Sequence, residues 1–346
     1  MIRFRKFLSI LISILIVVSM SVALMPGASA DIPEEEDIEA YVNDDPITSK
    51  AAIVIDFTTG LVIFEHNADE LRVPASMTKM LAVFVILDAI KAGYISIEAY
   101  IQPSRATSAF SFNRYYSNVP MPSHLFFSIR ELLAAVIVRS ACAATVALGE
   151  GVFGSEEELV RRMNEKIKQL GIDGIFYDSW GGSSNNMISA RGMAELTRAL
   201  IEEHPETLEF TSMQTILFNE IEYNNTNLLL DNYLGADGFK TGFTTPAGWC
   251  FTGTALVDGR RMISVTMGSL QGFRFYDSAI LLDYGFANFD DTVANHFRNS
   301  LKALDSVHAA RSPLIPISMY KIEETRFFSF RYLALLLNDT NTLLAS

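Results

Sequence analysis

The chain has 346 residues, of which 49% are hydrophobic and 19% charged, so it can bury a large core in one large domain or two smaller ones. Its net charge of −13 argues against nucleic acid as a partner and against a simple electrostatic hold on anionic lipid. Its five histidines and two cysteines are scattered and form no metal-binding motif, so we expect no metal site and no cofactor.

The first thirty residues have the pattern of an export signal. Arg3, Arg5 and Lys6 precede an apolar run from Phe7 to Met25, and the small residues of Ala28-Ser29-Ala30 follow. This pattern predicts a signal peptide over residues 1–30 and an exported protein, secreted or held at the outer face of the cytoplasmic membrane. An uncleaved anchor is the alternative, because the run is nearly long enough to span a bilayer. Residues 31–46 are acidic, lack Lys and Arg, and are expected to form a mobile lead-in.

A catalytic domain is expected over residues 47–290. Apolar, β-branched runs predict a hairpin of strands at 51–56 and 61–65, and Pro74 opens a helix that continues through 80–90. Further helices are predicted at 129–147, from 155 onwards and at 193–203, then strands at 248–257 and 262–267 and a helix at about 275–286. Strands, then helices, then strands again indicate an α+β fold whose antiparallel sheet carries a helical insertion.

Residues 291–346 are expected to form a short C-terminal extension. Its stretch Arg326–Leu337 is rich in aromatic residues and leucine, which favours packing on the protein body, with peripheral membrane contact as the alternative. The sequence does not decide whether Cys142 and Cys250 form a disulfide.

The candidate nucleophile lies in the motif Ser76-Met77-Thr78-Lys79. Residues three apart share one face of a helix, so the lysine amine can reach the serine hydroxyl. A serine hydroxyl needs a base to become a good nucleophile, and a lysine can be that base if burial lowers its pKa. The spacing alone is weak evidence, because Ser318-Met319-Tyr320-Lys321 repeats it.

Two further motifs follow Ser76 along the chain. Ser140-Ala141-Cys142 lies in an apolar segment, and Lys240-Thr241-Gly242 precedes Phe243. A lysine beside a threonine hydroxyl can hold a terminal carboxylate, and the glycine keeps a strand edge open to a substrate that pairs with it.

In order and spacing, these motifs resemble those of the serine penicillin-recognising enzymes. Between residues 51 and 289 the chain resembles the low-molecular-mass penicillin-binding proteins of the D-alanyl-D-alanine carboxypeptidase family. Three further stretches support the resemblance: Arg72–Lys79, Ser189–Ala194 and Asp283–Phe286. The resemblance implies a β-lactamase/transpeptidase-like fold, peptidoglycan D-Ala-D-Ala peptides as substrates and β-lactam antibiotics as covalent inhibitors.

The resemblance also implies the role of each site residue. Ser76 becomes acylated, Lys79 is its general base, and Ser140 relays a proton to the leaving amine. Thr241 binds the substrate carboxylate, and Lys240 supports this network electrostatically. The backbone N–H groups of Ser76 and Phe243 form the oxyanion hole, and Arg274 falls where the family often keeps a carboxylate-binding arginine.

Cys142 departs from the family pattern, which usually has Asn there. A thiol is a weak substitute for an amide as donor or acceptor, so the balance between hydrolysis and transfer is open. A D,D-transpeptidase and a catalytically silent relative that binds cell wall therefore remain alternatives. A class A-like β-lactamase is a third, although the sequence has no convincing Glu-x-x-Leu-Asn segment between the second and third motifs.

Overall fold

The protein is described by a computed structural model over residues 47–311, with side chains described for residues 47–296. The predicted signal peptide, the acidic lead-in, the Ser318 motif and the Arg326–Leu337 stretch lie outside these residues. None of the helices within residues 47–311 combines the length and the hydrophobicity that a membrane span needs.

A five-stranded antiparallel sheet forms the frame of the compact unit, which ends at Ala287. Its strand order is β2-β1-β11-β10-β9, so β9 is an edge strand. The bounds of its strands are β1 Ala51–Asp56, β2 Val62–His66, β9 Ala236–Thr244, β10 Gly248–Val257 and β11 Arg260–Ser269. The hairpins predicted near the two ends of the catalytic domain pair to build this one sheet, which confirms the α+β fold class.

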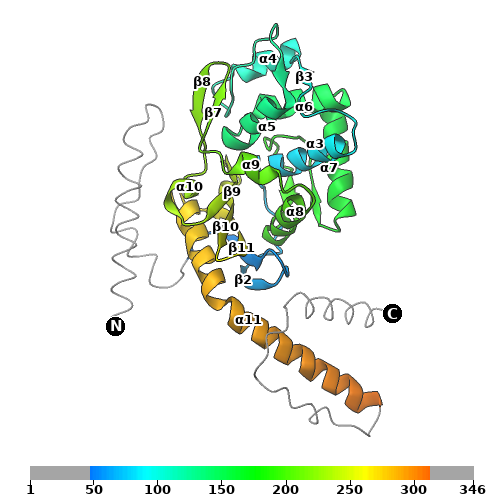
Figure 1. Cartoon of the computed structure of the whole chain (residues 1–346), viewed down its shortest axis with the longest axis vertical. Coiled ribbons are helices and arrows are strands. Elements are labelled where there is room, and N and C mark those ends of the chain that lie inside the picture. Colours follow the sequence, from blue (N-terminus) through cyan, green and yellow to red (C-terminus); the bar gives the residue numbers. More distant parts are fainter. Residues whose placement is uncertain (1–46, 312–346) are drawn as a thin grey trace. The chain divides into compact units, whose positions relative to one another are not determined.

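The helical subdomain is inserted between β2 and β9 (Figure 1, cyan and green). It begins with the 3₁₀ turn η1 Ala75–Thr78 and the helices α3 Lys79–Lys91, α4 Arg105–Ser111, α5 Ile129–Val138, α6 Cys142–Phe153 and α7 Glu156–Gln169. It ends with α8 Ala190–Glu203, α9 Thr207–Thr211 and α10 Leu229–Asn232. Short strand pairs link these helices: β3 Tyr100–Ile101 with β4 Phe127–Ser128, β5 Gly174–Ile175 with β6 Met187–Ile188, and β7 Thr215–Phe218 with β8 Ile221–Asn224.

The inner strand β1 is covered on both faces. All six of its residues are buried, and Ala51, Ile53 and Ile55 join the main core. The intervening Val54 faces the last helix, α11 Arg274–Arg311, at Gly285. Successive strand residues point to opposite faces, so one strand contributes to two apolar layers, and each fully buried aliphatic side chain stabilises the fold by about 1.5–3 kcal/mol.

Helix α3 runs through the middle of the helical subdomain. Nine of its apolar residues are buried, and it contacts α5, α6, α7 and α8. A helix that is apolar on all sides must be surrounded by protein. The first residue of this helix is Lys79, so the fold carries a charged side chain into its interior.

Two predicted helices have different bounds in the structure. The helix predicted at 129–147 is interrupted after Val138, and α6 begins at Cys142. The helix predicted at about 275–286 continues past Gly285 and extends to Arg311. A Cβ on Gly285 would lie 3.0 Å from Val54 Cγ2, so this glycine permits close packing of the helix on β1.

Candidate active site

Ser76 lies in η1, immediately before α3. Lys79 Nζ donates a hydrogen bond of 2.8 Å to Ser76 Oγ, so the predicted contact of the motif is present. Ser76 is half-buried, whereas Lys79 is fully buried. A substrate can therefore reach the hydroxyl while the amine is kept out of water.

The turn that carries Ser76 is held in a strained conformation between two glycines. Ala75 has a φ of +50°, a left-handed conformation that costs a non-glycine residue about 1 kcal/mol. On one side, a Cβ at Gly242 of β9 would lie 2.7 Å from Pro74 O. On the other side, a Cβ at Gly181 would lie 2.0 Å from Ala75 O. Both neighbouring backbones approach so closely because these glycines carry no side chain.

The amine of Lys79 has three partners in the protein. Besides Ser76, it donates to Trp180 O at 2.6 Å and to Cys142 Sγ at 3.5 Å. Burial lowers the pKa of Lys79 below its ordinary value, because a buried ammonium loses its hydration, and the interactions with Cys142 and Asp178 oppose this shift. The amine therefore loses its proton more readily than an exposed lysine does.

Ser140 and Cys142 lie at the interruption between α5 and α6. Ser140 has a φ of +61°, and the chain restarts as a helix at Cys142. The loop between α4 and β4 caps the start of α6: Ser117 O accepts from Cys142 N at 2.9 Å, and Asn118 Oδ1 accepts from Ala143 N at 2.8 Å. The interruption thus brings the thiol of Cys142 to the lysine amine.

The Ser140 hydroxyl donates to none of the site residues in the described part of the chain. Ser140 is buried, and its carbonyl accepts from Cys142 Sγ at 3.7 Å. The structure therefore brings Ser140 next to the site, and its role as a proton relay stays a prediction.

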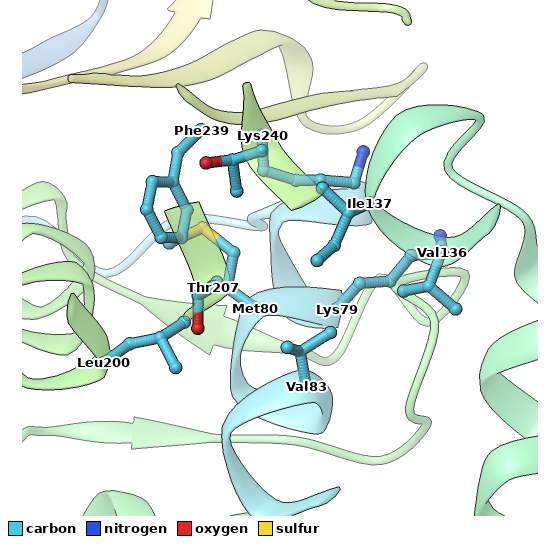
Figure 2. A pocket seen from close by; sticks show the side chains of 10 residues that line it. Lys79, Met80, Val83, Val136, Ile137, Leu200, Thr207, Phe239 and Lys240 are labelled. Atoms are coloured by element: carbon cyan, nitrogen blue, oxygen red, sulfur yellow. The ribbon is translucent and has the colours of Figure 1, made fainter. Parts of the chain in front are cut away.

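Lys240 brings a second amine towards the first one. In Figure 2 the Lys79 and Lys240 side chains extend in the same direction, beside the apolar side chains of Val136 and Ile137. Burial lowers the pKa of Lys240 well below its ordinary value, and the charges of Lys79 and Arg274 lower it further. Two ammonium groups that interact in a buried site repel each other, which favours a state in which one amine is neutral.

The edge strand β9 presents the rest of the third motif. Thr241 Oγ1 and Thr226 Oγ1 share a hydrogen bond of 2.8 Å. Phe243 is 50% exposed, and its ring packs on Trp249 at 4.4 Å between centroids. Within residues 47–311 no strand lies beside this edge of the sheet, so an extended ligand can pair with it.

Arg274 is the first residue of α11 and lies next to Gly242 of β9. It donates to Gly242 O at 3.5 Å, and its guanidinium stacks on the rings of Trp249 and Phe275. Burial lowers the pKa of Arg274 to about 10. No carboxylate in the described part of the chain pairs with it, so its positive charge is available to an anionic ligand.

Three elements of the site were not predicted from the sequence: the carbonyl of Trp180, the backbone of Gly181 and the hydroxyl of Thr226. Each contributes a backbone atom or a short polar side chain from a loop without a recognisable motif. Cys142 and Cys250 are both free and buried, so the possible disulfide is absent.

One cluster has the composition of a metal site. Ligand atoms of Asp88, Glu203 and His204 lie within 4.8 Å of one another. The Lys166 ammonium already pairs with Asp88 at 3.1 Å and with Glu203 at 3.0 Å. A cation of the protein therefore supplies the charge that a metal ion would supply.

A family profile and individual relatives point to the same protein family. The sequence profile of the family described as D-alanyl-D-alanine carboxypeptidase matches residues 38–271. D-alanyl-D-alanine carboxypeptidase DacA of Haemophilus influenzae is 32% identical over 267 residues, which cover 74% of this chain and 66% of that protein. DacC of Escherichia coli is 32% identical over 266 residues, 73% of this chain and 64% of that protein. The chain thus spans slightly less than two thirds of the length of these relatives.

Solved structures agree with this result. Penicillin-Binding Protein D2 from Listeria monocytogenes, in its ampicillin-bound form, is 30% identical with a TM-score of 0.61, covering 69% of this chain and 98% of that one. Penicillin binding protein 5 from Haemophilus influenzae is 31% identical with a TM-score of 0.67, covering 71% and 73%.

The close contact at Gly181 predicts a measurable destabilisation. Gly181→Ala is expected to lower the free energy of unfolding by about 3 kcal/mol, because its methyl group collides with Ala75 O in addition to the strain of its φ of +88°. Gly171→Ala is the matched control, since Gly171 has a φ of +70° with no atom near its Cβ, and about 1 kcal/mol is expected there. Urea denaturation measures both, and equal losses would contradict the proposed collision.

Proposed function

The chain belongs to the D-alanyl-D-alanine carboxypeptidase family, and we propose that it is a serine-type D-Ala-D-Ala carboxypeptidase that acts on peptidoglycan stem peptides through an acyl-enzyme on Ser76. The observation that carries the proposal is the hydrogen bond of 2.8 Å between Lys79 Nζ and Ser76 Oγ, formed by an amine that is fully buried. A neutral amine at this distance can take the hydroxyl proton.

In the proposed acylation, Lys79 is the base and Ser76 is the nucleophile. Neutral Lys79 takes the Ser76 proton as Oγ attacks the carbonyl carbon that joins the two D-alanines. The backbone N–H groups of Ser76 and Phe243 stabilise the resulting oxyanion. The C–N bond then breaks, and terminal D-alanine leaves with a proton that Ser140 relays to its amine.

Hydrolysis regenerates the enzyme. A water molecule attacks the ester carbon, the bond to Ser76 Oγ breaks, and the shortened peptide leaves as a carboxylic acid while the serine regains its proton. Lys79 is neutral again once its proton has left with D-alanine, so it takes a proton from the attacking water, returns it to Ser76 Oγ and is the base for both halves of the reaction.

Positive charge at the end of β9 supports the choice of a substrate with a free carboxylate. Arg274 lies 3.5 Å from Gly242 O with no acidic partner in the described residues, and Lys240 and Thr241 are neighbours on the strand. A terminal carboxylate placed here would be paired with charge and with the Thr241 hydroxyl. The peptide itself would extend along β9, whose outer edge pairs with no strand of the described residues.

β-Lactam antibiotics are proposed as covalent ligands of the same serine. The Listeria relative has been solved in ampicillin-bound and cefotaxime-bound forms. We further propose that the enzyme works outside the cytoplasmic membrane, where peptidoglycan lies, as the pattern of residues 1–30 predicts.

Covalent labelling tests the nucleophile. We expect a fluorescent penicillin to label the wild-type protein, and Ser76→Ala to abolish the label, because among the described residues the Ser76 hydroxyl is the one that accepts a hydrogen bond from a buried lysine amine. Ser318→Ala is the matched control, since Ser318 belongs to the second S-x-x-K motif, and it should label like the wild type. Gel fluorescence reads out all three, and a label that survives Ser76→Ala would exclude the proposed acyl-enzyme.

The fate of the acyl group separates this function from its alternatives. Release of D-alanine from a D-Ala-D-Ala peptide by water alone supports the carboxypeptidase, whereas release that requires an added amine acceptor supports a transpeptidase. Rapid turnover of bound penicillin supports a β-lactamase, and no covalent label at all supports a silent relative.

Cys142 gives a second prediction. Asn and Cys have similar volumes, so Cys142→Asn should fit the buried site while offering the substrate amide a full donor and acceptor. We expect kcat/KM for a D-Ala-D-Ala peptide to rise about tenfold, the value of one hydrogen bond of roughly 1.4 kcal/mol.

Two controls accompany this variant in the D-alanine release assay. Cys142→Ala removes the thiol without adding an amide, and Cys250→Ala removes the other buried thiol. Neither should show the gain. A fall in kcat/KM for Cys142→Asn would contradict the proposed contact of residue 142 with substrate.

A further inference from the structure

The turn formed by residues 178–183 is organised around one carboxylate. Asp178 Oδ1 accepts from the backbone N–H groups of Trp180 at 3.2 Å, Gly181 at 2.6 Å and Gly182 at 3.3 Å. Asp178 Oδ2 accepts from Ser183 N. A carboxylate can accept at both oxygens at once, so a single side chain fixes four consecutive amides of this turn.

A buried amide connects the same carboxylate to the catalytic motif. Asn186 is fully buried, and its Nδ2 donates to Asp178 Oδ1 at 3.2 Å and to Thr78 Oγ1 at 3.4 Å. Its Oδ1 accepts from Tyr177 N at 2.7 Å. Thr78 is the residue before Lys79, so the 178–183 turn is joined to the chain that carries the general base.

The 178–183 turn acts directly on the amine through Trp180 O, which accepts from Lys79 Nζ at 2.6 Å. A neutral amine has two N–H bonds and one lone pair, and a carbonyl oxygen can only accept. Trp180 O therefore occupies one N–H bond, which leaves the lone pair free to face the Ser76 hydroxyl. A displaced carbonyl would let the amine rotate away from this arrangement.

We propose that Asp178 is a positioning residue for the general base: it builds the turn that places Trp180 O against Lys79, and its negative charge acts on the amine. This inference rests on the proposed function of Lys79. Asp178 itself touches neither Ser76 nor the place of the substrate, so it acts through Lys79.

The charges around Lys79 distinguish Asp178 from its neighbours. Lys240 faces the amine from β9, Cys142 from α6 and Asp178 from the 178–183 turn. Asp178 raises the pKa of Lys79, whereas burial lowers it. Glu156 of α7 also holds this segment, accepting from Ser179 N at 3.0 Å and from Ser179 Oγ at 2.8 Å, but it accepts no hydrogen bond from the amides of residues 180–183.

Two substitutions separate charge from geometry. Asp178→Asn keeps an acceptor oxygen for Trp180, Gly181 and Gly182 and removes the charge, at the cost of the one hydrogen bond from Ser183 N to Oδ2. Without the negative charge the ammonium form of Lys79 is less stable, so the pKa of Lys79 falls. In a plot of the acylation rate constant against pH, the fall in rate on the acidic side then moves to lower pH. Asp178→Ala removes the acceptor as well, so the acylation rate constant should fall at least tenfold at every pH.

Glu156→Gln is the matched control, because it neutralises the neighbouring carboxylate of the same segment. It should leave the pKa of Lys79 and the acidic side of the pH profile of acylation as they are in the wild type. The pKa of Lys79 is measured by NMR titration of ε-¹³C-lysine, with the resonance assigned by its absence in Lys79→Met. Acylation by a fluorescent penicillin is measured by stopped flow over the same pH range.

The two measurements keep the inference distinct from the proposed function. A wild-type protein that takes no label fails the proposed function, while the NMR titration still compares the pKa of Lys79 in Asp178→Asn and Glu156→Gln. An unchanged pKa in Asp178→Asn, or an equal shift in Glu156→Gln, overturns the inference. If Asp178→Ala does not fold, Asp178→Asn and the control carry the test alone.

Discussion

A lysine amine withdrawn from water and held against a serine hydroxyl is the constraint on which the rest of the site depends. Lys79 is fully buried at the first residue of α3, where burial lowers its pKa. In water a lysine amine is protonated at neutral pH and cannot act as a base. The fold supplies this desolvation by surrounding α3 with helices and by covering the amine with the Trp180 carbonyl and the Cys142 thiol.

Each partner of the amine comes from a different part of the chain, so the site exists only in the folded protein. Ser76 and Lys79 belong to η1 and α3, Cys142 to α6, and Lys240 to the edge strand β9. Gly242 and Gly181 let two backbones close on η1 from opposite sides. This packing explains why the third motif and the loop around residue 181 belong to one structural unit, although sixty residues separate them.

The sequence predicted the sheet, the main helices and the contact between Ser76 and Lys79, because periodic apolar runs and a three-residue spacing are local signals. It missed the interruption at Ser140, after which Ser117 and Asn118 from another loop accept hydrogen bonds from the first two amides of α6. It also placed a helix end near Gly285, where the glycine instead permits packing on Val54. The role of the Trp180 carbonyl has no sequence signal, since every residue has a carbonyl.

The pH dependence of acylation by penicillin tests the central claim most directly, because the base must be unprotonated to act. Stopped-flow measurement on the wild-type protein should give a rate constant that falls with slope one as pH falls through a pKa below the ordinary lysine value of about 10.4. A limb centred near that ordinary value, or a rate constant independent of pH, would contradict the assignment of buried Lys79 as the base.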